Sequence, residues 1–294
     1  MANTWSQSTH EAYGSGLLVW HVHCDKRSIP ELLHAPVHHS YIASFIASLA
    51  GSYSRSTITN YLYRLWAWHL LHNVEWKLNT LKIEALLKGA AKLAPDSSKW
   101  KPRQPYTPDF ILKVGDQLNH TLPLDASVYA CLTNGFYSVV QVGELTVPRL
   151  NTFDPTKHVT PANLCTESNQ NGMEVTVLHI PHTKAAPLEG KDVYWSCQHG
   201  PTDPCQALEN HQQINNPGNG DHLFMYRHKG HLWPLTKHAF IKQVAEAAHT
   251  ARLEPLQGHG IRISATLFYL LWGVPFEAMK VMGQWSSNTF LRYL

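Results

Sequence analysis

Three residue types that act on phosphates or protons gather near the C-terminal end of the chain. His259 and Arg262 are three positions apart, so a helix would place them on one face. Tyr293 follows after the sequence Gly-Gln-Trp-Ser-Ser. Arginine binds phosphate oxygens, histidine transfers protons and a tyrosine hydroxyl is a nucleophile. With 20 histidines and 9 arginines in 294 residues, chance predicts about 0.6 His-x-x-Arg pairs, so the pair alone predicts no site.

Regular elements surround these residues. A helix is predicted from Ile261 to Trp272, with Gly273 as its C-cap. Proline suits a first helical turn, so a second helix is predicted from Pro275 to Met282 and ends at Gly283. Ser287 or Asn288 can cap the last turns. The three chemical residues therefore lie on, or directly after, short helices.

Upstream of them, the pattern is mixed. Strand composition in 174–180 and 192–197, separated by a loop with two prolines and a glycine, predicts a β-hairpin. Apolar spacing predicts helices in four further segments, which are Pro108–Leu118, Leu124–Val142, Pro204–Ile214 and Leu235–Leu253.

The first part of the chain reads as a small helical bundle. Helices are predicted over 38–50, from a Ser56 cap to His72, and from Leu81 to Leu93. The proline-rich and basic stretch Lys92–Asp109 predicts a linker between two domains, 1–104 and 105–294. Residues 1–104 hold 11 basic and 6 acidic residues, a net charge of +5, whereas the remainder holds 13 and 15, a net charge of −2. The overall +3 therefore hides a basic N-terminal half.

Composition argues against several classes of protein. No window of 18 apolar residues predicts a membrane span. The N-terminus lacks a charged segment followed by an apolar run, so we expect no secretory signal and an intracellular protein. The 5 scattered cysteines are typical of a reducing compartment rather than of a disulfide scaffold.

Taken together, the C-terminal segments resemble the signature of tyrosine recombinases, the phage-integrase family. The resemblance is closest to recombinases of fungal mobile elements of the Crypton kind. Asn134–Leu150 is similar to the family's first box, a helix that ends in Arg-x-Gly-Glu-Leu. Lys184 occupies the place of a lysine that the family carries on a β-hairpin, and Asp203–Asn215 also resembles the fungal sequences. The resemblance implies a mainly α fold with a small β-sheet or hairpin, in which a helical core-binding domain precedes an α/β catalytic domain.

The resemblance also implies roles for individual residues. Tyr293 would attack a DNA phosphate and form a 3′-phosphotyrosyl link. Arg262 would clamp the phosphate, and His259 would act as an acid, a base or a phosphate donor. Lys184 would protonate the departing 5′ oxygen, with Lys191 as the alternative lysine. No metal or other cofactor is implied.

Two positions depart from the family pattern. Gln141 stands where the first box has its arginine, and a neutral amide cannot supply a charged fork to a phosphate. The family's late histidine or tryptophan falls on Gln284 or Trp285, depending on the direction of counting. Both can donate a hydrogen bond.

Two other kinds of site are predicted from residue type alone. Five basic residues of the N-terminal half are candidates for contacts with DNA phosphates: Arg55, Arg64, Lys99, Lys101 and Arg103. The spacing of Cys197, His199, Cys205 and His211 permits a zinc ligand set but fits no compact finger, so we expect no metal there.

The sequence therefore predicts a nuclear protein that binds double-stranded DNA, associates with itself on DNA, and cleaves and rejoins it during the recombination or integration of a mobile element. One alternative is a domesticated DNA-binding protein whose catalysis is impaired by Gln141. A second alternative is a histidine-rich metal-binding or interaction protein.

Overall fold

The computed structural model describes residues 7–98, 105–168, 172–255, 259–283 and 285. The chain forms two compact units, Met1–Pro102 and Arg103–Leu294, and the division falls within the proline-rich stretch. Each unit has its own hydrophobic core.

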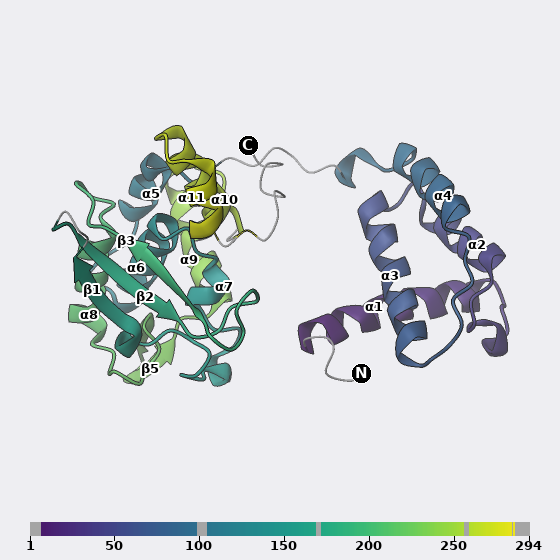
Figure 1. The fold of residues 1–294 in the computed structure, drawn as a ribbon, viewed down its shortest axis with the longest axis horizontal. Coiled ribbons are helices and arrows are strands. Elements are labelled where there is room, and N and C mark those ends of the chain that lie inside the picture. The colour runs from purple at the N-terminus through teal and green to yellow at the C-terminus, as the bar shows by residue number, and fades with distance from the viewer. Residues whose placement is uncertain (1–6, 99–104, 169–171, 256–258, 284, 286–294) are drawn as a thin grey trace. The chain divides into compact units, whose positions relative to one another are not determined.

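Helices make up the regular structure described in the first unit (Figure 1). Helix α1 packs against α3, and α4 packs against both α2 and α3. Ser54, rather than the predicted Ser56, caps α3 by accepting a hydrogen bond from the Thr57 N–H. The bounds are α1 Gln7–Lys26, α2 His39–Leu49, α3 Arg55–Leu71 and α4 Thr80–Lys92, with short 3₁₀ turns η1 Glu31–Leu33 and η2 Asp96–Ser98.

The central element of the second unit is α6 (Pro123–Tyr137), which is buried along most of its length. It packs against helices on several sides and against strands of both sheets (Figure 1). The surrounding helices are α5 Pro108–Gly115, α7 Val142–Leu145, α8 Pro204–Asn215, α9 Lys237–Thr250, α10 His259–Leu271 and α11 Phe276–Met282, with 3₁₀ turns η3 Leu150–Thr152 and η4 Pro161–Asn163.

Two small antiparallel sheets complete this unit. The first has the order β1-β2-β3, with β1 Leu164–Ser168, β2 Glu174–Ile180 and β3 Lys191–Trp195. It confirms the predicted hairpin, and its register pairs Ile180 with Lys191 at the loop end. Strand β1 and the second sheet, β4 Met225–His228 with β5 His231–Pro234, were not predicted.

The predicted helix Leu124–Val142 was wrong at its C-terminal end. Helix α6 stops at Tyr137 because Val139 adopts a left-handed conformation with a φ of 58°. The N–H of Val140 then donates to the carbonyl of Gly135 at 3.0 Å, which closes the helix as a Schellman motif normally does with glycine. The chain turns sharply here and begins α7 at Val142, so Gln141 becomes the N-cap of a new helix.

None of the helices among the described residues is long and apolar enough to cross a membrane.

Candidate active site

Arg262 is a buried cation of the second unit, with 6% of its surface exposed. It lies on the second turn of α10, and one guanidinium nitrogen, Nη2, donates to the carbonyl oxygen of Gly283. The guanidinium carbon also lies 4.1 Å from the centre of the Trp285 ring, a cation–π contact. Its Nε has no hydrogen-bond partner among the described residues. The guanidinium is therefore held by one carbonyl and one aromatic face, with donor capacity left over.

Glu144 is the acidic residue of this site. It is half-buried on α7, and its Oε2 accepts the backbone N–H of Gln141 at 3.1 Å. Burial raises the pKa of Glu144, whereas the Gln141 N–H, Arg262 and Lys191 act in the opposite direction. The carboxylate therefore lies within electrostatic range of both cations.

Lys191 is the second cation. It is half-buried at the start of β3, and its Nζ donates to the carbonyl oxygen of Val281 at 3.0 Å. Burial lowers the pKa of Lys191, the nearby Arg262 lowers it further, and Glu144 opposes both. A lysine with a lowered pKa releases its proton more readily, which suits a general acid.

Arg262 and Lys191 thus meet at one end of α11. They come from segments far apart in the sequence, yet they donate to carbonyls only two positions apart, Val281 and Gly283. The last carbonyls of a helix carry partial negative charge. In this conformation the two carbonyls accept the hydrogen bonds that Lys191 and Arg262 would otherwise donate to an incoming phosphate.

Lys184, the first choice from sequence, lies in the loop between β2 and β3 and is exposed. Arg262 and Lys191 both lower the pKa of Glu144, and Glu144 raises that of Arg262. Lys184 is not among the groups that shift either pKa. A sequence signal for Lys191 existed, since alternate residues of a strand share one face. Val193 and Trp195 are buried, so Lys191 begins the inward-facing set.

The structure describes only some of the remaining predicted site residues. His259 is the first residue of α10, but its side chain lies outside the described part. Gln284 and Tyr293 also lie outside the described residues. Of the two candidates for the late position, Trp285 contacts Arg262. Gln141 is half-buried beside Glu144, where the family pattern has its arginine.

The predicted DNA contacts fall in the first unit or at its boundary. Arg55 forms an ion pair with Glu84 at 2.6 Å, which occupies part of its charge. Arg64 donates to the Ser15 hydroxyl and lies 5.5 Å from the centre of the Tyr61 ring. The other three candidates, Lys99, Lys101 and Arg103, lie outside the described residues.

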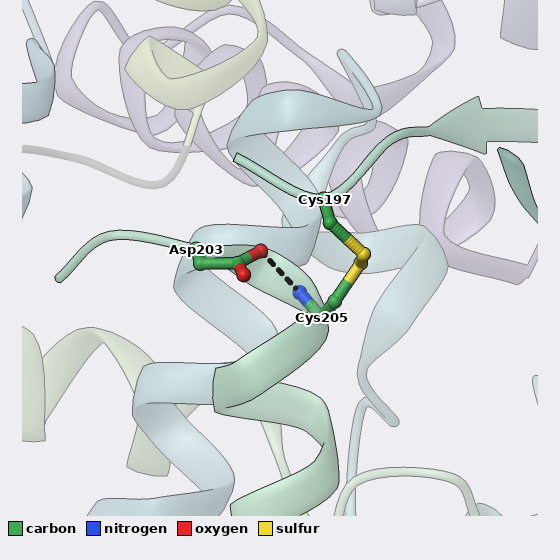
Figure 2. Close-up of side chains that lie close together, drawn as sticks. All are labelled: Cys197, Asp203 and Cys205. Carbon is green, nitrogen blue, oxygen red and sulfur yellow. Dashed lines mark hydrogen bonds between the residues drawn. A yellow bond between two sulfur atoms is a disulfide. The ribbon is translucent and has the colours of Figure 1, made fainter. Parts of the chain in front are cut away.

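The candidate zinc ligands do not assemble as a set. Cys197 and Cys205 form a disulfide, which the sequence did not predict (Figure 2). Asp203 lies beside them, but its Oδ1 accepts the backbone N–H of Cys205 at 2.9 Å and so caps α8. His211 is buried elsewhere, with its Nε2 on the carbonyl of Leu223 at 2.8 Å. The pairing is possible because the loop before α8 brings residues eight positions apart to a Cα separation of 5.3 Å.

Comparison with known proteins identifies the fold. No protein-family model and no curated protein matches the sequence. Among solved structures, a lambda integrase dimer bound to a COC′ core site is similar, with 13% identity, 99% of this chain and 89% of that chain covered, and a TM-score of 0.56. The Tn1549 transposon integrase in complex with transposon right-end DNA is similar as well, with 13% identity, 99% and 90% coverage, and a TM-score of 0.57. The chain therefore has the mainly helical fold of tyrosine recombinases, with small antiparallel sheets.

Proposed function

We propose that this chain is a DNA-binding tyrosine recombinase of a mobile element, of the fungal Crypton kind, acting in the nucleus. The observation that carries the proposal is the convergence of Arg262 and Lys191 beside Glu144 at the end of α11. Two cations in a partly buried site, of which Arg262 has an Nε without a partner among the described residues, are suited to a phosphodiester. The DNA complexes of the two similar integrases support duplex DNA as the partner, and the lambda dimer supports self-association.

The chemistry follows from these positions. A DNA phosphate would replace the carbonyls of Val281 and Gly283 as the acceptor for Lys191 and Arg262. The Tyr293 hydroxyl would then attack phosphorus, forming the Tyr–O–P bond while the bond to the 5′ oxygen breaks. His259 would take the tyrosine proton, and Lys191 would give its proton to the 5′ oxygen. The reverse sequence with a second 5′ hydroxyl rejoins the strand.

Lys191 is the better candidate than Lys184 for the acid. It is half-buried within electrostatic range of Arg262, and its lowered pKa favours proton release. Trp285, packed against Arg262, is the better candidate than Gln284 for the late position.

The neutral side chain of Gln141 favours a second candidate function. Loss of one preorganised donor to a transition-state charge typically costs about 10²–10³-fold in rate. A chain that keeps Arg262 and Lys191 but lacks the first arginine would still bind DNA, while cleaving it slowly. This second candidate is a domesticated DNA-binding protein.

The test begins with selection of a binding duplex from a random double-stranded DNA library by the full chain. Binding is expected to weaken steeply with salt, as it does when phosphates are neutralised. The selected duplex is then nicked near its centre, so that a cleaved strand cannot be rejoined, and incubated with the protein. We expect a covalent protein–DNA adduct that is absent in Tyr293→Phe and retained in Tyr194→Phe, a half-exposed control tyrosine on β3.

Each outcome separates the candidates. An adduct lost only in Tyr293→Phe supports the recombinase. No wild-type adduct, with an adduct after Gln141→Arg, supports the impaired DNA-binding protein. Salt-insensitive binding, or no selectable duplex at all, contradicts both.

A further inference from the structure

Helix α10, which carries Arg262, is contacted on its opposite face by a residue that is distant in the sequence. The backbone N–H of Tyr106 donates to the hydroxyl of Ser264 at 2.8 Å, across 158 positions of sequence. Both residues are buried, with 1% and 5% of their surfaces exposed. The Tyr106 ring in turn packs edge-on against Phe110 of α5. The contact therefore joins α10 to the start of the second unit.

The same ring fixes the preceding turn of α10. A Cβ added to Gly260 would lie 3.3 Å from Cε2 of Tyr106, closer than most real contacts of that kind. The aromatic ring thus packs directly on the backbone of Gly260. Any side chain at this position would push α10 and the ring apart.

Helix geometry links both contacts to Arg262. Residues 260 and 264 are four apart and share one face of α10, whereas residue 262 lies between them and points away. Tyr106 therefore holds the back of the turn whose front carries the guanidinium. On that front, Arg262 has a single hydrogen-bonded acceptor and an Nε without a partner among the described residues. The guanidinium therefore depends on the position of the α10 backbone as well as on the Gly283 carbonyl and the Trp285 ring.

We infer that Tyr106 is a positioning residue for Arg262, acting through Ser264 and Gly260. The inference rests on the proposed function, because it concerns the placement of a phosphate clamp. Tyr106 lies close to the N-terminal boundary of the second unit, which begins at Arg103. The point at which the chain enters the catalytic unit is thus also the point that fixes the arginine.

The test is the rate of adduct formation with the nicked, selected duplex at saturating concentration. Ser264→Ala removes the acceptor of the Tyr106 N–H, and Gly260→Ala displaces the ring. A displacement of about 1 Å at a reacting group can cost about 10²-fold, so a smaller shift predicts a loss of about tenfold. Ser127→Ala is the matched control: it removes a buried serine of α6 that donates to the carbonyl of Phe224 at 2.8 Å and not to Tyr106.

A second substrate separates positioning from a general loss of structure. At the linkage where the wild-type adduct maps, a methylphosphonate replaces one charged oxygen by a methyl group. A neutral linkage needs less charge compensation from a guanidinium. We therefore expect the defect of Ser264→Ala and Gly260→Ala to shrink to within about twofold on this substrate, as it should for Arg262→Ala.

The possible results decide the matter. Ser264→Ala and Gly260→Ala reacting as fast as Ser127→Ala would overturn the inference. So would a defect of equal size on both substrates, since this would not act through Arg262. A wild-type chain that forms no adduct would refute the proposed function, and this inference with it.

Discussion

Two core histidines should make the second unit sensitive to acid. His211 and His222 are fully buried. Burial lowers the pKa of His211 from 6.5 to about 4, against its hydrogen bond to the Leu223 carbonyl. Burial, with His158 nearby, lowers the pKa of His222 to about 3. The Nδ1 of His211 accepts from the Asn215 amide at 3.0 Å, so a proton there would break that bond.

The sign and size of the effect follow from these values. Both pKa values are lower in the folded state, so the folded chain holds neutral imidazoles where the unfolded chain holds protonated ones. Stability is therefore complete above pH 6.5 and is lost as the pH falls below it. Each group loses about 1.4 kcal/mol per pH unit in that range, so each costs about 2 kcal/mol at pH 5. Together the two histidines should remove about 4 kcal/mol between pH 8 and pH 5.

The perturbation is His222→Phe, which replaces the imidazole by a ring that cannot titrate. It suits the site because Phe153 and Phe224 lie with ring centres 5.6 Å and 6.4 Å away. The free energy of unfolding is measured in urea at pH 8 and pH 5, through hydrogen exchange of α6 and α8, so that the first unit does not contribute. The variant should lose only about half as much stability as the wild type between these pH values.

His249→Ala, at an exposed position on α9, is the control and should keep the full pH dependence. If His222→Phe also kept it, His222 would not be a buried neutral group and the reasoning would fail.

Three further predictions concern the site and the disulfide. Gln141→Arg should raise the rate of adduct formation by about 10²–10³-fold, whereas Gln141→Met should change little; an equal effect of both would show that charge is not what this position lacks. Lys191→Met should slow cleavage by about 10²-fold or more, and a sulfur in place of the 5′ bridging oxygen should restore the rate, because a thiolate leaves without a proton. Lys184→Met should have little effect, and the opposite pattern would make Lys184 the acid. Cys197→Ser should lower the free energy of unfolding by about 2–3 kcal/mol relative to the oxidised wild type, measured in urea; a similar stability for both would show that the bond to Cys205 adds nothing.

Regular periodicity explains what the sequence could predict of the fold. The β2–β3 hairpin and the helices with clear apolar spacing were found because each buries one face. Helix α1 was not identified, because glycines interrupt its pattern. Gly16 is needed there because a Cβ would collide with the Arg64 side chain on α3. Such close helix packing is tertiary information that no local pattern contains.

The short strands were not predicted for a different reason. Strands β4 and β5 have four residues each, which is too short for an alternating pattern to stand out. Their turn carried a signal nevertheless. Lys229 and Gly230 both have positive φ, 50° and 81°, as a two-residue hairpin of this type requires. The pair Lys229-Gly230, between two short segments that each contain an aromatic residue, therefore could have predicted that hairpin.

The candidate site shows the limit most clearly. The resemblance to the family signature pointed to Arg262, but it placed the hairpin lysine first at Lys184 and only second at Lys191. That choice depends on the hairpin register, which pairs Lys191 with Ile180 and leaves Lys184 in the exposed loop. Register is set by which face is buried, and this is decided by packing against the rest of the unit.

Glu144 determines how strongly a glutamine at position 141, in place of the family's arginine, should affect the site. In this site a half-buried carboxylate lies near two cations, and burial raises its pKa although the Gln141 N–H and both cations act in the opposite direction. An arginine at position 141 would stand beside that carboxylate as well as beside the phosphate. Glutamine supplies no charge, so Glu144 interacts with Arg262 and Lys191, the two cations that the proposed mechanism assigns to the phosphate. If the site binds a phosphate as proposed, Gln141 should weaken that binding in two ways: it lacks a charged donor, and it leaves Glu144 to compete with the phosphate for the two remaining cations. Removing this competition in Glu144→Gln should recover part of the rate that Gln141→Arg recovers, and the two changes together should be less than additive, because both relieve the same unbalanced charge. Full additivity in that double-mutant cycle would show that Glu144 and position 141 act independently.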